Sequence, residues 1–310
     1  MTWKCLCAFL LLGALLPLQA VARGSQAETA DESERLVEYL VRPSDTDAAI
    51  HLYNDPHYVV FTRGARLDTQ LVLFMPGTGG RPTNARCLLT TIAAQGYRVI
   101  GLEYNDSPAV TDVCQTSLSV SCSGDLRRRR IFGGDITSHV EHASAESIVN
   151  RLVKLLEYLD REHPQEGWSR YLNQGSPAWP HVVVSGLSQG AGMAAYIAKH
   201  VSVARVVLFS SPWDYVRTPQ SLAPWLAEPS ATTPERWFAE YHRRENTAAL
   251  IARAYEVLHI PPGNIRVFDL PAGPAAHGSN PFHTSTILVP EYAPQWRFLF
   301  GQTPPPGAGR

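Results

Sequence analysis

The chain has 310 residues, of which 45% are hydrophobic and 18% are charged, a balance typical of a folded globular protein. This composition excludes an intrinsically disordered chain, a collagen-like repeat and a small domain held together by disulfides. The 27 Lys and Arg residues nearly cancel the 28 Asp and Glu residues, and the formal net charge is -1. The chain therefore has no overall electrostatic field that would draw it to nucleic acid or to an anionic membrane.

Residues 1–22 have the pattern of a secretory signal peptide. Lys4 supplies the positive charge, a nearly all-apolar run follows, and residues 20–22 (Ala-Val-Ala) offer a cleavage site. The run is short for a membrane span, and an uncleaved anchor is the alternative interpretation. We therefore expect a soluble mature domain over residues 23–302 and a disordered Pro/Gly tail at 303–310. The protein would be exported to the periplasm or out of the cell, with no stable membrane span.

Three cysteines remain after removal of this segment. Cys114 and Cys122 lie close together in a Ser/Thr-rich stretch, and an oxidising compartment would favour a disulfide between them. Two free thiols are the alternative. Cys87 lies in an apolar helical stretch and is expected to be an inert, buried thiol.

Strands and helices alternate along the chain, which predicts an α/β fold with a mostly parallel, doubly wound sheet. Residues 71–75 are entirely apolar, as is typical of a strand buried on both faces. Other strands are expected at residues 37–41, 58–62, 97–103, 181–186, 205–209 and 265–270. Helices are expected at residues 84–95, 148–159, 190–200, 247–258 and 292–300.

Two segments look irregular. Residues 104–136 are interpreted as a long loop, in which the arginine run 127–130 is a solvated surface. An anion-binding patch and a protease site are the alternatives for this run. Residues 215–245 are a possible cap over a site. Three tryptophans are candidate apolar walls beneath this cap: Trp213, Trp225 and Trp237.

The strongest chemical signal is the G-x-S-x-G pattern at residues 186–190 (Gly-Leu-Ser-Gln-Gly), directly after a valine-rich strand and before a helix. A serine hydroxyl is a weak nucleophile that must be exposed and activated. A sharp strand-to-helix turn exposes the serine at the sheet edge, and the glycines allow close backbone approach. Ser188 is therefore the candidate nucleophile, and a purely structural turn is the alternative.

A glycine-rich loop follows the buried strand at residues 76–80 (Pro-Gly-Thr-Gly-Gly). Acyl transfer builds negative charge on an oxygen, which fixed backbone N–H groups must meet. The candidate oxyanion-hole donors are Gln189, after the nucleophile, and Thr78 or Gly79 in this loop. A plain turn is the alternative. A phosphate loop is disfavoured because no G-K-[ST] follows.

A base and an acid must complete a catalytic triad with Ser188. His277 and His283 both follow the last strand and compete as the base. Asp214 follows the strand after the nucleophile, where loops converge on a site, and is favoured as the acid over Asp269. Residues 139–142 (His-Val-Glu-His) lack the spacing of a zinc motif, so we expect no metal site.

The chain resembles the α/β-hydrolase superfamily of serine esterases and lipases, and more narrowly an exported subgroup whose activities are largely uncharacterised. The residues that carry the resemblance span about 70–300: 76–80, Cys114 and Cys122, 148–152, 167–168, 185–190, 198–200, 210–214 and 283–287. The resemblance implies Ser188 as nucleophile, Asp214 as acid and His283 as base. The family usually places its acid after a later strand, which leaves Asp269 open.

We therefore expect an exported serine hydrolase that cleaves a small-molecule or lipid carboxylic ester through an acyl-enzyme. This chemistry needs no metal and no organic cofactor. Two alternatives remain open at this point: a serine peptidase or amidase, and a non-catalytic binding protein on the same fold.

Overall fold

The computed structural model describes residues 36–301 except 67, 135–143, 219, 275 and 277–279. The expected signal peptide and the expected tail lie outside these residues. Within the described part, none of the helices is both long and apolar enough to cross a membrane.

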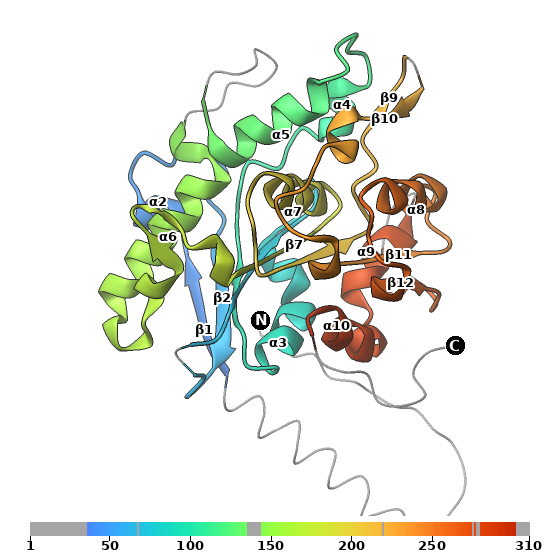
Figure 1. The fold of residues 1–310 in the computed structure, drawn as a ribbon. Helices are drawn as coiled ribbons and strands as arrows, with labels where there is room; N and C mark the ends of the chain where they lie inside the picture. The colour runs from blue at the N-terminus through green and yellow to red at the C-terminus, as the bar shows by residue number, and fades with distance from the viewer. Residues whose placement is uncertain are drawn as a thin grey trace, which may run out of the picture.

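Eight strands form one sheet, with helices packed around it (Figure 1). β1 and β2 pair antiparallel, as do β2 and β4, and every other neighbouring pair is parallel. This confirms the predicted α/β class with a mostly parallel sheet. In spatial order the strands are β1 (Leu36–Val41), β2 (His57–Thr62), β4 (Arg98–Gly101), β3 (Leu71–Met75), β7 (Val182–Leu187), β8 (Arg205–Phe209), β11 (Trp237–His242) and β12 (Ile265–Phe268).

Two short hairpins lie outside this sheet, β5 (Leu172–Asn173) with β6 (Ser176–Pro177) and β9 (Tyr215–Val216) with β10 (Ser221–Leu222). The α-helices are α2 (Pro43–Thr46), α3 (Arg86–Ala93), α4 (Val110–Cys114), α5 (Cys122–Phe132), α6 (Ile148–Glu162), α7 (Gln189–His200), α8 (Ala248–Val257), α9 (Pro281–Leu288) and α10 (Ala293–Leu299).

Helices cover both faces of the sheet, and each face has its own hydrophobic core. α5, α6, α7 and α8 contribute to one core, and α3, α9 and α10 contribute to the other. β3 shows how a fully apolar strand supports both. Leu71, Leu73 and Met75 point into the first core, while Val72 and Phe74 point into the second. This alternation is the period of two that a strand imposes on its side chains.

The segment 104–136, expected to be an irregular loop, contains two helices where it is described. It forms α4 and α5, joined at their ends by the predicted Cys114–Cys122 disulfide. The arginine run lies on α5, and three of its four side chains are buried, so the interpretation as a solvated surface is wrong. The Cys87 side chain is only partly buried, against the expectation of full burial.

The segment 215–245, expected as a possible cap, is in part a strand of the main sheet. Its last part is β11, which lies inside the main sheet between β8 and β12. Trp225 and Trp237 are buried in the first core, and Trp213 packs against that core. None of these three rings lines the pocket beside Ser188, so their expected role as its walls is wrong.

Candidate active site

Ser188 lies at the sharp turn between β7 and α7, as the G-x-S-x-G pattern predicts. Its backbone is strained, with φ 54° and ψ -115°. Its N–H donates to the carbonyl of Phe209 on β8 at 2.9 Å, which fixes the turn to the sheet. A Cβ on Gly190 would lie 2.0 Å from the Met75 carbonyl oxygen, and one on Gly186 would lie 2.4 Å from the Gly190 carbonyl carbon. Only glycine fits at these two positions.

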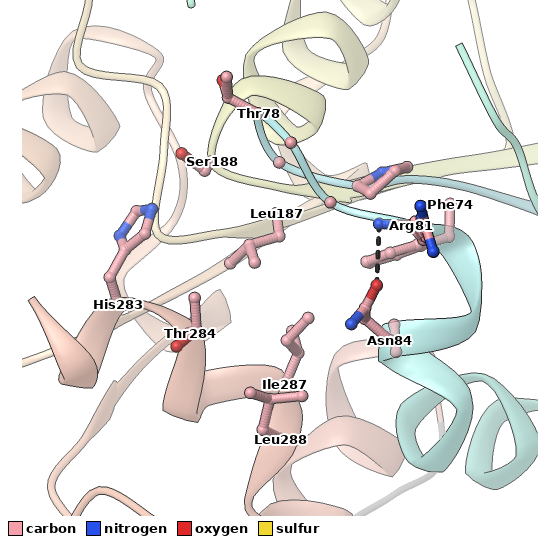
Figure 2. A pocket seen from close by; sticks show the side chains of 15 residues that line it. Phe74, Thr78, Arg81, Asn84, Leu187, Ser188, His283, Thr284, Ile287 and Leu288 are labelled. Carbon is pink, nitrogen blue, oxygen red and sulfur yellow. Dashed lines mark hydrogen bonds between the residues drawn. The ribbon is translucent and has the colours of Figure 1, made fainter. Parts of the chain in front are cut away.

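The loop at residues 76–80 passes directly beside this turn. A Cβ built on Gly77 would lie 3.2 Å from the Cβ of Ser188, and Figure 2 shows Thr78 next to the serine. Asp106 lies beside this loop, where the backbone N–H groups of Gly79 and Gly80 lower the pKa of its carboxyl and oppose part of the effect of burial.

Gln189, the first residue of α7, connects the serine turn to the chain around Asp106. Its side-chain amide donates to the Asp106 carbonyl at 3.2 Å, and its side-chain oxygen accepts from the Val110 N–H at 3.3 Å. Both contacts are buried. They fix the N-terminus of α7, whose positive end favours a nearby anion, to the chain at residues 106–110.

His283 lies in the first turn of α9 and faces Ser188 across one end of a pocket (Figure 2). The Nδ1 atom of His283 lies 2.7 Å from Oε2 of Glu245. A carboxylate can only accept, so Nδ1 carries a proton, and in the neutral ring Nε2 is then the acceptor on the other side. This is the tautomer that a base toward a serine hydroxyl requires.

Glu245 is the carboxylate that the sequence reasoning missed. Its side chain is 0% exposed, and its second oxygen, Oε1, accepts from the His242 N–H and from the Ser210 hydroxyl, both at 2.7 Å. Ser210 follows β8 with a positive φ of 54°, unusual for a residue other than glycine. The charge is therefore buried with three donors around it, as a buried carboxylate requires.

Two other polar residues of β11, His242 and Glu240, lie near the Glu245 carboxylate. His242 ends β11, and its ring accepts from the Arg244 N–H at 3.1 Å and donates to the Leu270 carbonyl at 2.8 Å. Burial lowers its pKa, so the ring is neutral. Glu240, inside β11, is fully buried, and burial together with the nearby Glu245 raises its pKa well above the usual range. Glu240 is therefore a neutral acid, and Glu245 has no second anion beside it.

Asp214, the expected acid, is engaged elsewhere. Its carboxylate accepts two hydrogen bonds from Arg127 on α5, at 2.7 and 2.5 Å, and one from the indole of Trp225 at 2.9 Å. Asp214 is paired in this way because the buried Arg127 needs a carboxylate, which Asp214 supplies. Asp269, the alternative, has a side chain that is 56% exposed and pairs loosely with Arg243 at 3.7 Å. His277 and residues 139–142 lie outside the described residues.

The Arg127–Asp214 pair predicts a large effect on stability. Both side chains are 2% exposed, and removing one partner of a buried pair leaves the other charge without compensation. Arg127→Met is expected to lower the free energy of unfolding by about 3–5 kcal/mol, measured by urea denaturation. Arg128→Met, at the adjacent exposed position, is the matched control and should change it little. Equal effects of the two variants would contradict a structural role for this pair.

Asp106 predicts a pH dependence of stability. Burial raises its pKa from 3.8 to about 6, despite the opposing hydrogen bonds from Gly79 and Gly80. The folded protein therefore binds more protons than the unfolded chain between these values, and its stability falls as pH rises through this window. The fall due to Asp106 should be about 1–3 kcal/mol. Asp106→Asn keeps the acceptor oxygen and should remove it. The control is Asp269→Asn, and a pH profile unchanged in both variants would contradict the assignment.

Ser188 and His283 open into a pocket of about 380 Å³. Figure 2 shows apolar side chains from β7 and α9 on one side of it and the loop at residues 76–80 on the other. The side chains that make its apolar wall are Phe74, Ala85, Leu187, Ile287 and Leu288. Within the part of the chain that the structure describes, no group of three or more His, Cys, Asp or Glu side chains could hold a metal ion.

No protein-family model matches the sequence, and no curated protein matches it significantly. Several solved structures do match this chain. Esterase B from Lactobacillus rhamnosis is 16% identical, with a TM-score of 0.45, over 91% of this chain and 94% of its own. A hormone-sensitive lipase from a metagenome library is 15% identical, with a TM-score of 0.42, over 92% of each chain. The feruloyl esterase module from Clostridium thermocellum is 12% identical, with a TM-score of 0.43, over 89% of this chain and 91% of its own. The sheet order and the serine turn of the chain itself are those of an α/β-hydrolase fold.

Proposed function

We propose that the protein is a serine hydrolase that cleaves carboxylic esters, with Ser188 as nucleophile, His283 as base and Glu245 as acid. The observation that carries the proposal is the 2.7 Å contact between the buried Glu245 and the Nδ1 atom of His283, whose ring faces the strained Ser188. These three residues provide a nucleophile, a base and a group that orients the base, which is the minimum set for covalent acyl transfer.

In this mechanism, the Ser188 oxygen attacks the acyl carbon while Nε2 of His283 takes the hydroxyl proton. The negative charge on the former carbonyl oxygen is met by the N–H groups of Gln189 and Thr78. His283 then gives its proton to the leaving alcohol, and the acyl-enzyme forms. Water attacks this ester with His283 again as base, which releases the acid and restores the serine. Glu245 stabilises the imidazolium in both steps and keeps its own negative charge.

The pocket supports an ester with a short or medium acyl group. Its volume, about 380 Å³, lies at the small end of the usual range for small-molecule sites, and its wall is mainly apolar. An acyl chain against Leu187, Ile287 and Leu288 would bury apolar surface beside the reacting carbonyl. A long lipid chain would extend past the pocket into solvent.

The test is steady-state hydrolysis of p-nitrophenyl esters with acetyl, butyryl, octanoyl and palmitoyl groups. We expect kcat/KM to be highest for the butyryl or octanoyl ester and Ser188→Ala to be inactive on all four. Butyryl p-nitroanilide, the amide of the same acid, should be hydrolysed far more slowly. Faster hydrolysis of the anilide would support an amidase instead. No turnover of any substrate by the folded protein would support a binding protein.

We also propose that the protein acts outside the cytoplasm, in the periplasm or beyond the cell. The Cys114–Cys122 disulfide supports an oxidising compartment, and residues 1–22 have the composition of a signal peptide. Cell fractionation with N-terminal sequencing of the purified protein tests this. A mature N-terminus near Arg23 is the expected result, and an intact Met1 in the cytosolic fraction would contradict export.

A further inference from the structure

The pocket beside Ser188 carries a polar side chain that the proposed ester hydrolysis does not use. Figure 2 shows Ser188 and His283 at one end of the pocket and Asn84 at the other. Asn84 lies in the short 3-10 helix Pro82–Ala85, which contacts α9, the helix that carries His283. Asn84 is exposed, so a molecule bound in the pocket can reach its side chain.

One hydrogen bond fixes the orientation of the Asn84 amide. Its Oδ1 accepts from the backbone N–H of Arg81 at 3.0 Å. A backbone N–H can only donate, so this bond distinguishes the oxygen of the amide from its nitrogen. Figure 2 shows the nitrogen on the other side, pointing away from the Arg81 N–H and toward Ile287 of α9. Asn84 therefore presents an N–H donor to the pocket.

The side chains around this donor are apolar. Phe74, Ile287 and Leu288 line the same pocket. An amide at a pocket wall is hydrogen-bonded to water until a bound group displaces that water. A purely alkyl group would leave the Asn84 donor without an acceptor, which lowers affinity, whereas a group with an oxygen at this position replaces the lost hydrogen bond. The pocket therefore favours an acyl group that is apolar along its length and carries an acceptor near its end.

The charges in the lining favour a neutral acceptor over an anion. Arg81 lines the pocket, but its Nε lies 2.7 Å from Oδ2 of Asp55. His283, the other basic side chain among the described residues of the lining, is held by Glu245. A substrate carboxylate would compete with these two carboxylates for their partners. A ketone or ether oxygen accepts from the Asn84 amide without such competition.

We propose that the pocket selects esters whose acyl group carries a neutral oxygen acceptor, such as a ketone or an ether. This inference rests on the proposed ester hydrolysis and names its substrate class. The acyl group lies along Leu187 and Ile287, and its distal oxygen accepts from Nδ2 of Asn84. Asn84 acts in binding and selection, while the bond-making steps remain those of Ser188 and His283.

The test is hydrolysis of matched methyl esters, followed by pH-stat titration. Methyl 4-oxopentanoate and methyl 5-oxohexanoate are each compared with the apolar ester in which CH–CH₃ replaces the ketone, methyl 4-methylpentanoate and methyl 5-methylhexanoate. We expect kcat/KM of the parent protein to be about 3–10-fold higher for the keto ester in at least one pair. Monomethyl glutarate, which has a carboxylate in place of the methyl ketone, should be hydrolysed more slowly than methyl 5-oxohexanoate.

Two variants test the role of the amide. Asn84→Asp keeps the acceptor for the Arg81 N–H and removes the donor, and Asn84→Ala removes both without adding a charge. In each, the keto-to-apolar ratio of kcat/KM should fall to about one or below. Thr83→Val, at the adjacent exposed position outside the lining, is the matched control and should keep the parental ratio.

The outcomes separate this inference from the proposed function. Three results would overturn the inference and leave ester hydrolysis in place: a parental ratio near one in both pairs, a preference that survives either Asn84 variant or falls equally in Thr83→Val, or faster hydrolysis of monomethyl glutarate than of the keto esters. No hydrolysis of any ester by the folded protein, p-nitrophenyl butyrate included, would overturn the proposed function and this inference together.

Discussion

Replacing Ser188 by alanine is expected to lower kcat for ester hydrolysis by about 10⁴-fold or more, because no other group at the turn can form the acyl-enzyme. His283→Ala should cause a loss of similar size, and the double variant should be no worse than either single one. This lack of additivity is expected because the serine is not activated without its base. Initial rates on p-nitrophenyl butyrate measure all three variants.

The matched control is Ser119→Ala, which removes an exposed hydroxyl far from the turn and should leave kcat unchanged. Purified variants must keep the far-ultraviolet spectrum of the parent protein. A Ser188→Ala variant that retains a tenth or more of the parental kcat would contradict the assignment of the nucleophile. Without the acyl-enzyme, only the oxyanion donors and substrate binding remain, and these accelerate hydrolysis by only about 10³–10⁴-fold over the reaction in water.

Glu245→Gln is expected to lower kcat by about 10²–10⁴-fold at neutral pH. Glutamine keeps the size of the side chain, and its amide can donate to Nδ1 of His283. The imidazole would then carry its proton on Nε2, where it cannot accept the Ser188 proton, and the imidazolium would lose its anion. KM should change little, because Glu245 is buried and does not line the pocket.

The comparison that distinguishes Glu245 from Asp214 is a double variant, Arg127→Met with Asp214→Leu. It removes both members of the buried pair together, which is far less destabilising than leaving one charge alone. If Asp214 is structural, this double variant keeps kcat within about tenfold of the parent. A loss of kcat as large as that of Glu245→Gln, in a folded protein, would instead support Asp214 as the acid.

The position of Ser188 could be predicted from sequence because its determinants are local. The valine-rich strand, the two glycines and the following helix lie within one short stretch, and the structure gives them the turn that this pattern predicts. The strands that form the middle of the sheet were predictable for a similar reason. β3 and β8 are buried on both faces and are therefore apolar at nearly every position.

Glu245 was not predictable in the same way, because its role depends on recognising β11. That strand contains Glu240 and His242, polar residues that interrupt the apolar run expected of a buried strand. Glu245 then follows two arginines and resembles part of a solvated charged turn. The available signal was the stretch of aromatic residues at 237–241, which has strand propensity. Recognising this strand would have placed Glu245 directly after its carboxyl end.

Asp214 and the arginine run show the converse error. Taken alone, the aspartate predicts an acid at a strand end, and the arginines predict a hydrated surface. The structure pairs Asp214 with Arg127 across 87 positions of the chain and buries both. A long-range pair of this kind has no signature in local sequence, because each partner is polar and typical of an exposed loop when read without the other.

In the proposed mechanism, His283, held by Glu245, activates Ser188. The most direct measurement is the rate of covalent labelling by a fluorophosphonate, with the modified residue identified by peptide mass spectrometry. We predict one adduct, on Ser188, that forms rapidly in the parent protein, much more slowly in Glu245→Gln, and not at all in Ser188→Ala. Labelling of a different residue, or no labelling of the folded parent protein, would contradict the claim.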